Sequence, residues 1–133
     1  MGVIFDTSVL VGLERTSSKL DQFILGREEE AFGISAITVS ELLHGVHRAG
    51  SEKRRIIRAA YVEKIIEVFP VFSFDLGAAR IYARLWANLA QRGKAVGAHD
   101  LIIAATCLSL GFSLATLDLR SYGLIEGLDI AKL

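Results

Sequence analysis

The sequence has little of several features that define other protein classes. It contains one cysteine, Cys107, and one proline in 133 residues, which excludes an internal disulfide framework and a cysteine-rich metal site. Its longest apolar runs, such as LIIAA at 101–105, are far shorter than the ~20 residues that a bilayer crossing needs. No basic segment precedes a long apolar stretch at the N-terminus, so we expect no signal peptide. These absences predict a cytoplasmic protein without membrane contact, with Cys107 as a core thiol.

The chain also lacks an excess of charge of either sign. Fifteen basic and fifteen acidic residues give a formal net charge of zero, which argues against a protein that coats nucleic acid through bulk charge. A nucleic-acid enzyme with a local basic patch stays compatible with this balance. One cluster of basic residues is either a solvated helix face or a patch that contacts phosphates: Arg48, Lys53, Arg54, Arg55 and Arg58.

The apolar residues that are present indicate one compact domain over residues 1–133. They make up 52% of the chain against 23% charged residues, a composition typical of a globular protein. Short apolar runs alternate with longer helical periodicities. The pattern predicts strands at 1–5, 31–35, 71–73 and 112–116, with a possible last strand at 129–133. It predicts helices at 7–14, 19–25, 38–49, 52–68, 75–92 and 98–110.

Alternating strands and helices predict an α/β fold. Parallel strands need crossover connections, and these crossovers are right-handed, so the sheet is expected to be central, mostly parallel and flanked by helices in three α/β/α layers. Asp75 is a suitable N-cap for the long helix that follows it. Gly50 and Gly111 are suitable helix terminators. In such folds the chemistry gathers at the carboxyl ends of the strands.

Four acids stand at strand ends or helix starts. Asp6 follows the first strand directly, and Glu41 lies in the helix after the second. Asp100 belongs to the first turn of a very apolar helix, and Asp118 follows the strand that ends at Thr116. Each acid alone has an ordinary explanation as a helix cap, a first-turn acid or a turn residue. A parallel sheet would nevertheless bring all four to one edge.

Basic residues are absent from the sequence around these acids. No lysine or arginine lies within three residues of Asp6, Glu41 or Asp100, so local ion pairing cannot neutralise them. Carboxylates that crowd together without a counter-charge raise one another's pKa or recruit a cation. Oxygen ligands suit hard cations, Mg²⁺ or Mn²⁺. We therefore expect a divalent cation held by Asp6, Glu41 and Asp100, with Asp118 completing the site or holding a second ion.

Four segments together resemble a known family. They read FDTSVLV, TVSELLHGVHRA, GAHDLIIAATCLSLGFSLAT and LDLRSYGLIEGLDI, and they span nearly the whole chain in the family's order. This pattern is similar to the PIN domain family, specifically the VapC-like toxins of toxin–antitoxin pairs. The resemblance implies an acidic Mg²⁺ or Mn²⁺ pocket, endoribonuclease activity on RNA, a cognate antitoxin that blocks the pocket, and commonly a homodimer.

The resemblance also implies roles for particular residues. The first three family acids match Asp6, Glu41 and Asp100, and Asp118 best matches the fourth, a position that varies. Ser121 and Tyr122 replace an acid–Phe pair that is often found after it. Small hydroxyl positions that can steer water or the scissile phosphate match three further residues: Thr7, Ser8 and Thr116.

Other functions fit the sequence less well. A phosphatase with Asp6 as nucleophile would want a second acid where Ser8 stands, and a receiver-type switch would want an acidic pair and a later lysine. A catalytically idle PIN-like module that only binds RNA or protein is the main alternative.

No histidine is needed as a base for the chemistry. His99, which adjoins Asp100, is either a solvated bystander or a contact to substrate. His44 and His47 share the helix of Glu41, with His44 a candidate for the pocket rim. None of the three is expected to be a metal ligand.

The predicted helix at 75–92 is apolar around most of its circumference. Such a helix is either internal core or a surface shared with another chain, here a second copy or an antitoxin. Its polar stripe is Arg80, Arg84, Asn88 and Gln91. Its apolar stripe is Leu76, Ala79, Ala83, Trp86 and Ala90, widened by Ile81, Tyr82, Leu85 and Leu89.

Overall fold

The computed structural model describes residues 2–15, 25 and 29–132. Its strands form one sheet in the order β3-β2-β1-β4, and neighbouring strands pair in parallel. The central strand β1 sets Val3 opposite both Phe32 and Ser113. The strands are β1 (Gly2–Phe5), β2 (Ala31–Ser35), β3 (Val71–Phe72) and β4 (Ser113–Ala115).

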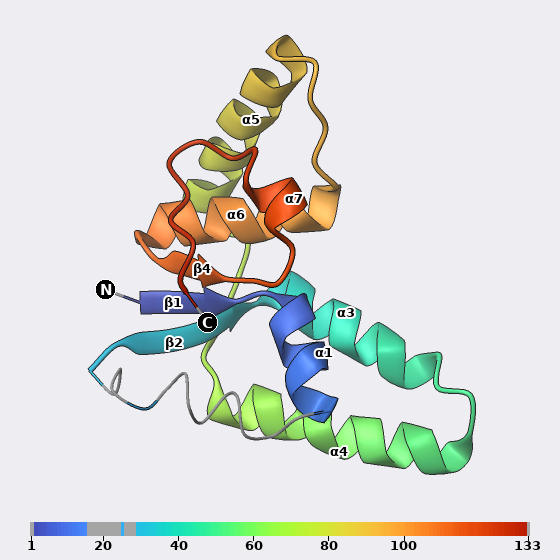
Figure 1. The fold of residues 1–133 in the computed structure, drawn as a ribbon. Coiled ribbons are helices and arrows are strands. Elements are labelled where there is room, and N and C mark those ends of the chain that lie inside the picture. The colour runs from blue at the N-terminus through green and yellow to red at the C-terminus, as the bar shows by residue number, and fades with distance from the viewer. Residues whose placement is uncertain (1, 16–24, 26–28, 133) are drawn as a thin grey trace.

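Helices cover both faces of this sheet, which confirms the predicted three-layer α/β/α fold. In Figure 1 the helices α5, α6 and α7 lie on one side of the strands, and α1, α3 and α4 lie on the other. The helices are α1 (Thr7–Arg15), α3 (Ala36–His47), α4 (Glu52–Val68), α5 (Leu76–Gln91), α6 (Ala98–Leu110) and α7 (Leu119–Tyr122).

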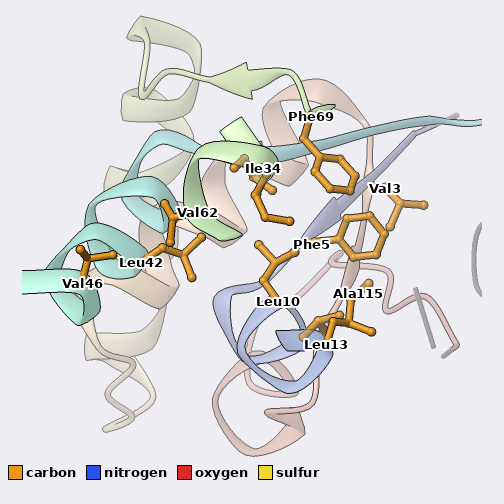
Figure 2. Packing of buried hydrophobic residues seen from close by; sticks show 12 residues of the cluster. Val3, Phe5, Leu10, Leu13, Ile34, Leu42, Val46, Val62, Phe69 and Ala115 are labelled. Carbon is orange, nitrogen blue, oxygen red and sulfur yellow. The ribbon is translucent and has the colours of Figure 1, made fainter. Parts of the chain in front are cut away.

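The alternation of side chains along β1 builds two cores. Phe5 points to one side, where it lies beside Phe69 (Figure 2), with the two ring centroids 5.5 Å apart. The Phe5 ring centroid also lies 5.6 Å from that of Phe32. Ile4 points to the other side and packs into the cluster that contains Cys107, which is fully buried as expected. β1 is therefore buried on both faces, and Asp6 is the first polar residue after this apolar strand.

Local capping explains where the helices start and stop. The Asp75 side chain accepts a hydrogen bond from the Ala78 amide at 2.9 Å, which confirms its N-cap role. Gly111 ends α6 with a φ of 70°, a conformation that glycine adopts without strain. The helix expected at 38–49 instead begins at Ala36, because Ser35 caps it by accepting from the Ile37 amide. It ends at His47, before Gly50 is reached.

Three other expectations differ from the structure or fall outside it. The strand expected at 129–133 is, within the described residues, only a single parallel bridge between Ile130 and Leu114. The short helix α7 was not expected, because four residues carry too little periodicity to detect. The helix expected at 19–25 lies outside the described residues except for Leu25.

Helix α5 exposes large apolar side chains that a helix facing only solvent would not need. Leu85 and Leu89 are buried, whereas Leu76 is 68% exposed and Trp86 is 63% exposed. The apolar stripe expected for this helix thus lies partly on the surface of the single chain. No helix within the described ranges combines the length and apolar character needed to span a bilayer.

Candidate active site

The candidate site lies where β1, β2 and β4 end at one edge of the sheet. Asp6 directly follows β1, and its amide donates to the Ala115 carbonyl of β4 at 2.9 Å. Glu41 comes to this edge on α3, which follows β2. Asp100 comes on the first turn of α6, and α6 packs against both β4 and α3. The parallel order of the strands is what gathers these distant segments.

Asp6 is a buried carboxylate that is held by hydroxyl groups. It is only 4% exposed. Ser8 Oγ donates to its Oδ2 at 2.7 Å, and Thr116 Oγ1 donates to the same oxygen at 2.9 Å. The Tyr122 hydroxyl lies 3.0 Å from the other oxygen, Oδ1. These donors compensate for the cost of burying the charge.

The backbone after β4 fixes the direction of two of these donors. Ser8 Oγ accepts from the Leu117 amide at 3.1 Å, and Thr116 Oγ1 accepts from the Asp118 amide at 2.9 Å. Because each hydroxyl already accepts from a backbone N–H, its own hydrogen is free for the Asp6 carboxylate. The connection between β4 and α7 therefore positions Asp6.

Asp100 shares the Tyr122 hydroxyl with Asp6. The hydroxyl oxygen lies 3.2 Å from Asp100 Oδ1. Burial and then the negative charge of Asp6 raise the pKa of the Asp100 carboxyl, while the Tyr122 hydrogen bond lowers it, and Asp118 and Glu41 raise it further. The pKa of Tyr122 is raised far above its ordinary value by burial and by both carboxylates, so this side chain stays a donor. All four acids thus act within one electrostatic neighbourhood.

Glu41 occupies a more open part of the same edge. Thr7 Oγ1 lies 2.7 Å from Glu41 Oε1 and 3.1 Å from Thr38 Oγ1. The hydroxyl has one hydrogen, and the shorter contact with the carboxylate is the stronger bond. His99 Nδ1 lies 3.5 Å from Glu41 Oε2, and the Glu41 side chain is 31% exposed. Glu41 therefore faces solvent more than Asp6 does.

Asp118 stabilises the start of α7 at this edge of the sheet. It is the N-cap of α7, and its Oδ1 accepts from the Ser121 amide at 3.4 Å. One of its oxygens is thereby committed to the helix. Asp118 contributes charge to the neighbourhood of Asp100, but it is the acid of the four with an evident local role.

The donor set has the chemistry that a hard divalent cation prefers. Its members are carboxylate and hydroxyl oxygens, the ligands of Mg²⁺ and Mn²⁺. In residues 2–15, 25 and 29–132, no lysine or arginine forms an ion pair with any of the four acids. Within the same ranges no three Asp, Glu, His or Cys side chains form a ready-made metal group. The residues fit a cation in kind, and holding one requires side-chain adjustment.

Comparison with known proteins identifies the family of this chain. The model of the PIN domain family matches residues 3–124. The chain belongs to the PIN domain family. Ribonuclease VapC1 of Rickettsia felis is 35% identical over 130 residues, which cover 98% of this chain and 95% of that protein.

Solved structures share the fold of this PIN domain over its whole length. The DNA-bound VapBC complex of Salmonella typhimurium contains a chain that is 26% identical, with a TM-score of 0.87, over 98% of this chain and 97% of that one. VapBC-5 of Mycobacterium tuberculosis, a member of the VapBC family of toxin–antitoxin systems, contains a chain that is 27% identical, with a TM-score of 0.80, over the full length of both.

The structure brings the expected site residues of this PIN domain to one edge of the sheet. The three small hydroxyl residues contact different acids there. Thr7 contacts Glu41, whereas Ser8 and Thr116 contact Asp6. Their expected roles toward a cation, water or phosphate stay predictions. Sequence reasoning missed the contacts of Tyr122. The available signal was a tyrosine in an apolar pattern, because a buried tyrosine hydroxyl needs a partner.

Proposed function

We propose that this PIN domain is a divalent-cation-dependent endoribonuclease and the toxin of a toxin–antitoxin pair. The observation that carries the proposal is the meeting of Asp6, Glu41 and Asp100, from three separate segments, at one sheet edge. In the described part of the chain none of these acids forms an ion pair with a lysine or arginine, and the one nearby basic group is the His99 imidazole, 3.5 Å from Glu41. The name of the 35% identical relative, a ribonuclease, supports RNA as the substrate.

Each residue of the site has a part in this proposal. Asp6, Glu41 and Asp100 hold Mg²⁺ or Mn²⁺, and Asp118 adds charge or completes the site. When bound, such a cation lowers the pKa of water and polarises a phosphoryl oxygen. Ser8 and Thr116 fix Oδ2 of Asp6, which leaves Oδ1 on the side of Asp100. Thr7 orients Glu41 by a hydrogen bond of 2.7 Å. We assign the open side around Glu41 as the entrance for the RNA backbone.

The proposal includes an antitoxin that covers the site. Similar solved structures are VapBC complexes, and one of them is described as a toxin–antitoxin system. A cavity of about 260 Å³ lies beside Glu41, between α1, α3 and α4. An antitoxin segment seated in this cavity would cover Glu41, the one site acid that lines it. The cavity is lined by Val11, Glu14, Glu41, Leu42, Gly45, Arg58 and Val62.

A homodimer is the second proposed assembly. The outer face of α5 exposes Leu76 and Trp86, and the Trp86 ring packs edge-on against Tyr82 at a centroid distance of 6.0 Å. Burial of large apolar side chains by a second copy would remove this surface from water. Light scattering of the purified protein tests this assembly, and a concentration-independent monomer would contradict it.

Cleavage of RNA with and without cations tests the proposed function. Purified protein is incubated with total bacterial RNA in EDTA, Mg²⁺ or Mn²⁺, and the new RNA ends are mapped. We expect discrete ends only with a cation, and their loss in a Glu41→Gln variant, which keeps the side-chain volume. Equal cleavage in EDTA would contradict the cation requirement. Absence of cleavage by folded protein in every condition would favour the idle module, in which the hydroxyl-satisfied Asp6 is purely structural.

A further inference from the structure

Tyr122 is a buried side chain with a functional group in the acidic edge. It is 1% exposed, and among the residues that the structure describes it is the largest of the fully buried side chains. Its hydroxyl oxygen lies 3.0 Å from Asp6 Oδ1 and 3.2 Å from Asp100 Oδ1. One phenolic oxygen therefore bridges two of the three carboxylates to which we assign the cation.

We propose that Tyr122 is a positioning residue that sets Asp6 and Asp100 for binding a divalent cation. This inference rests on the proposed function, and it concerns a residue to which the resemblance assigns no role. Ser8 and Thr116 donate to Oδ2 of Asp6, and the Tyr122 hydroxyl contacts the other oxygen, Oδ1. Because the same hydroxyl also contacts Asp100, it holds Asp6 Oδ1 beside Asp100. Tyr122 itself stays outside the cation's ligands, because a neutral phenol is a poor ligand next to two carboxylates.

Packing alone does not account for the hydroxyl. The aromatic ring belongs to the apolar cluster of α6 and β4, which a phenylalanine would fill equally well. The hydroxyl, by contrast, is directed at two carboxylates, Asp6 and Asp100, rather than at the apolar side chains of the cluster.

The bridge acts by restricting the carboxylates before the cation arrives. A hydrogen bond to a ligating carboxylate fixes its rotation, so less freedom is lost when the ion binds. The single hydrogen goes to one carboxylate at a time, which leaves lone pairs on both for the ion. Without the hydroxyl, Asp6 Oδ1 and Asp100 lose their shared contact, and the two like charges are free to turn away from each other.

Two tyrosine-to-phenylalanine variants test this role. Tyr122→Phe removes the bridge. Tyr61→Phe removes a hydroxyl that donates to the Leu10 carbonyl at 2.6 Å and whose charged neighbour is Glu14 rather than any of the four site acids, and it is the matched control. Mn²⁺ is titrated into each protein, and free Mn²⁺ is measured by electron paramagnetic resonance. Loss of such a supporting contact weakens metal binding about 10- to 100-fold, so we expect this for Tyr122→Phe and wild-type affinity for Tyr61→Phe.

Two further readouts separate positioning from folding. Thermal melts in EDTA report the folded state of each variant, and the gain in melting temperature on adding Mn²⁺ should be smaller for Tyr122→Phe. The Mn²⁺ concentration for half-maximal RNA cleavage should rise, with cleavage recovering at high Mn²⁺. If Tyr122 only stabilised the fold, high Mn²⁺ would not restore RNA cleavage by Tyr122→Phe.

The outcomes distinguish this inference from the proposed function. Wild-type protein that binds Mn²⁺ while Tyr122→Phe binds it equally or more tightly would overturn the positioning role alone. Wild-type protein that binds no Mn²⁺ would overturn the proposed function, and the positioning role with it. Weaker binding in both phenylalanine variants would also overturn the inference, because the effect would then be general.

Discussion

The acidic edge has a closed half and an open half, and they satisfy their carboxylates differently. In the closed half Asp6 is 4% exposed and is contacted by three hydroxyl groups. In the open half the Glu41 side chain is 31% exposed and has one hydroxyl donor and a nearby histidine. Buried charge demands partners, whereas exposed charge is solvated by water.

This difference indicates a division of labour. The closed half restricts its carboxylates by hydrogen bonds from the chain, which limits the adjustment that binding an ion requires. The open half leaves Glu41 room to move toward an ion and toward RNA. The following substitutions test this division, from the largest expected effect to the smallest.

Asp6→Asn should have the largest effect, because it removes the best-ordered charge. The amide oxygen can accept from Ser8 and Thr116, and the amide nitrogen can donate to the Tyr122 oxygen, so the fold is preserved. We expect cleavage to fall by more than about 100-fold, beyond the loss typical of a supporting residue. Gel assays of RNA cleavage, with circular dichroism as the folding control, measure this. Wild-type cleavage by the folded variant would remove Asp6 from the site.

Asp100→Asn should change stability with pH when no cation is present. Burial and the neighbouring Asp6 raise the pKa of the Asp100 carboxyl, with Asp118 and Glu41 adding to the effect. The folded state therefore holds this proton more tightly than the unfolded state, so wild-type stability falls as pH rises from the ordinary carboxyl value through the raised pKa.

The asparagine variant lacks this penalty. Urea unfolding in EDTA should show it to be more stable than wild type at pH 7, with the difference fading in acid. The control is Asp129→Asn, which removes one solvent-exposed carboxylate. An Asp100→Asn protein that is less stable than wild type at neutral pH would contradict the penalty that we assign to the ionised Asp100 carboxyl.

Thr7→Val should weaken the open half to a lesser degree. It removes the donor that contacts Glu41 at 2.7 Å, and supporting contacts of this kind are worth about 10-fold or more in activity. Thr7→Ser keeps the hydroxyl and is the matched control. Initial rates of RNA cleavage should separate the two variants. Equal rates would show that Glu41 does not depend on Thr7.

A substitution of Asp118 that keeps the N-cap of α7 should cause the smallest loss of cleavage. Asparagine is as good an N-cap as aspartate, whereas alanine costs about 1 kcal/mol. Asp118→Asn should therefore lose less cleavage than Thr7→Val, and Asp118→Ala should lower the unfolding free energy in addition. Urea unfolding and cleavage rates on both variants measure this. A loss for Asp118→Asn as large as that for Asp6→Asn would make Asp118 a principal ligand.

Part of this site could be predicted from the sequence. The strand before Asp6 and the apolar helix around Asp100 each have strong local patterns, and a parallel sheet places both at one edge. The hydroxyl contacts could not be predicted, because Thr116 and Tyr122 meet Asp6 across more than a hundred residues. Tyr122 also sits in an apolar pattern that is typical of core, and only its tertiary surroundings give its hydroxyl a purpose.

The most direct test of the central claim is a crystal structure of the protein soaked with Mn²⁺, with the ion located by its anomalous scattering. The account predicts an anomalous peak between the carboxylates of Asp6 and Asp100, within reach of Glu41, with the Tyr122 hydroxyl still bonded to Asp6. Mn²⁺ bound elsewhere, with this edge empty and its carboxylates unchanged, would contradict it.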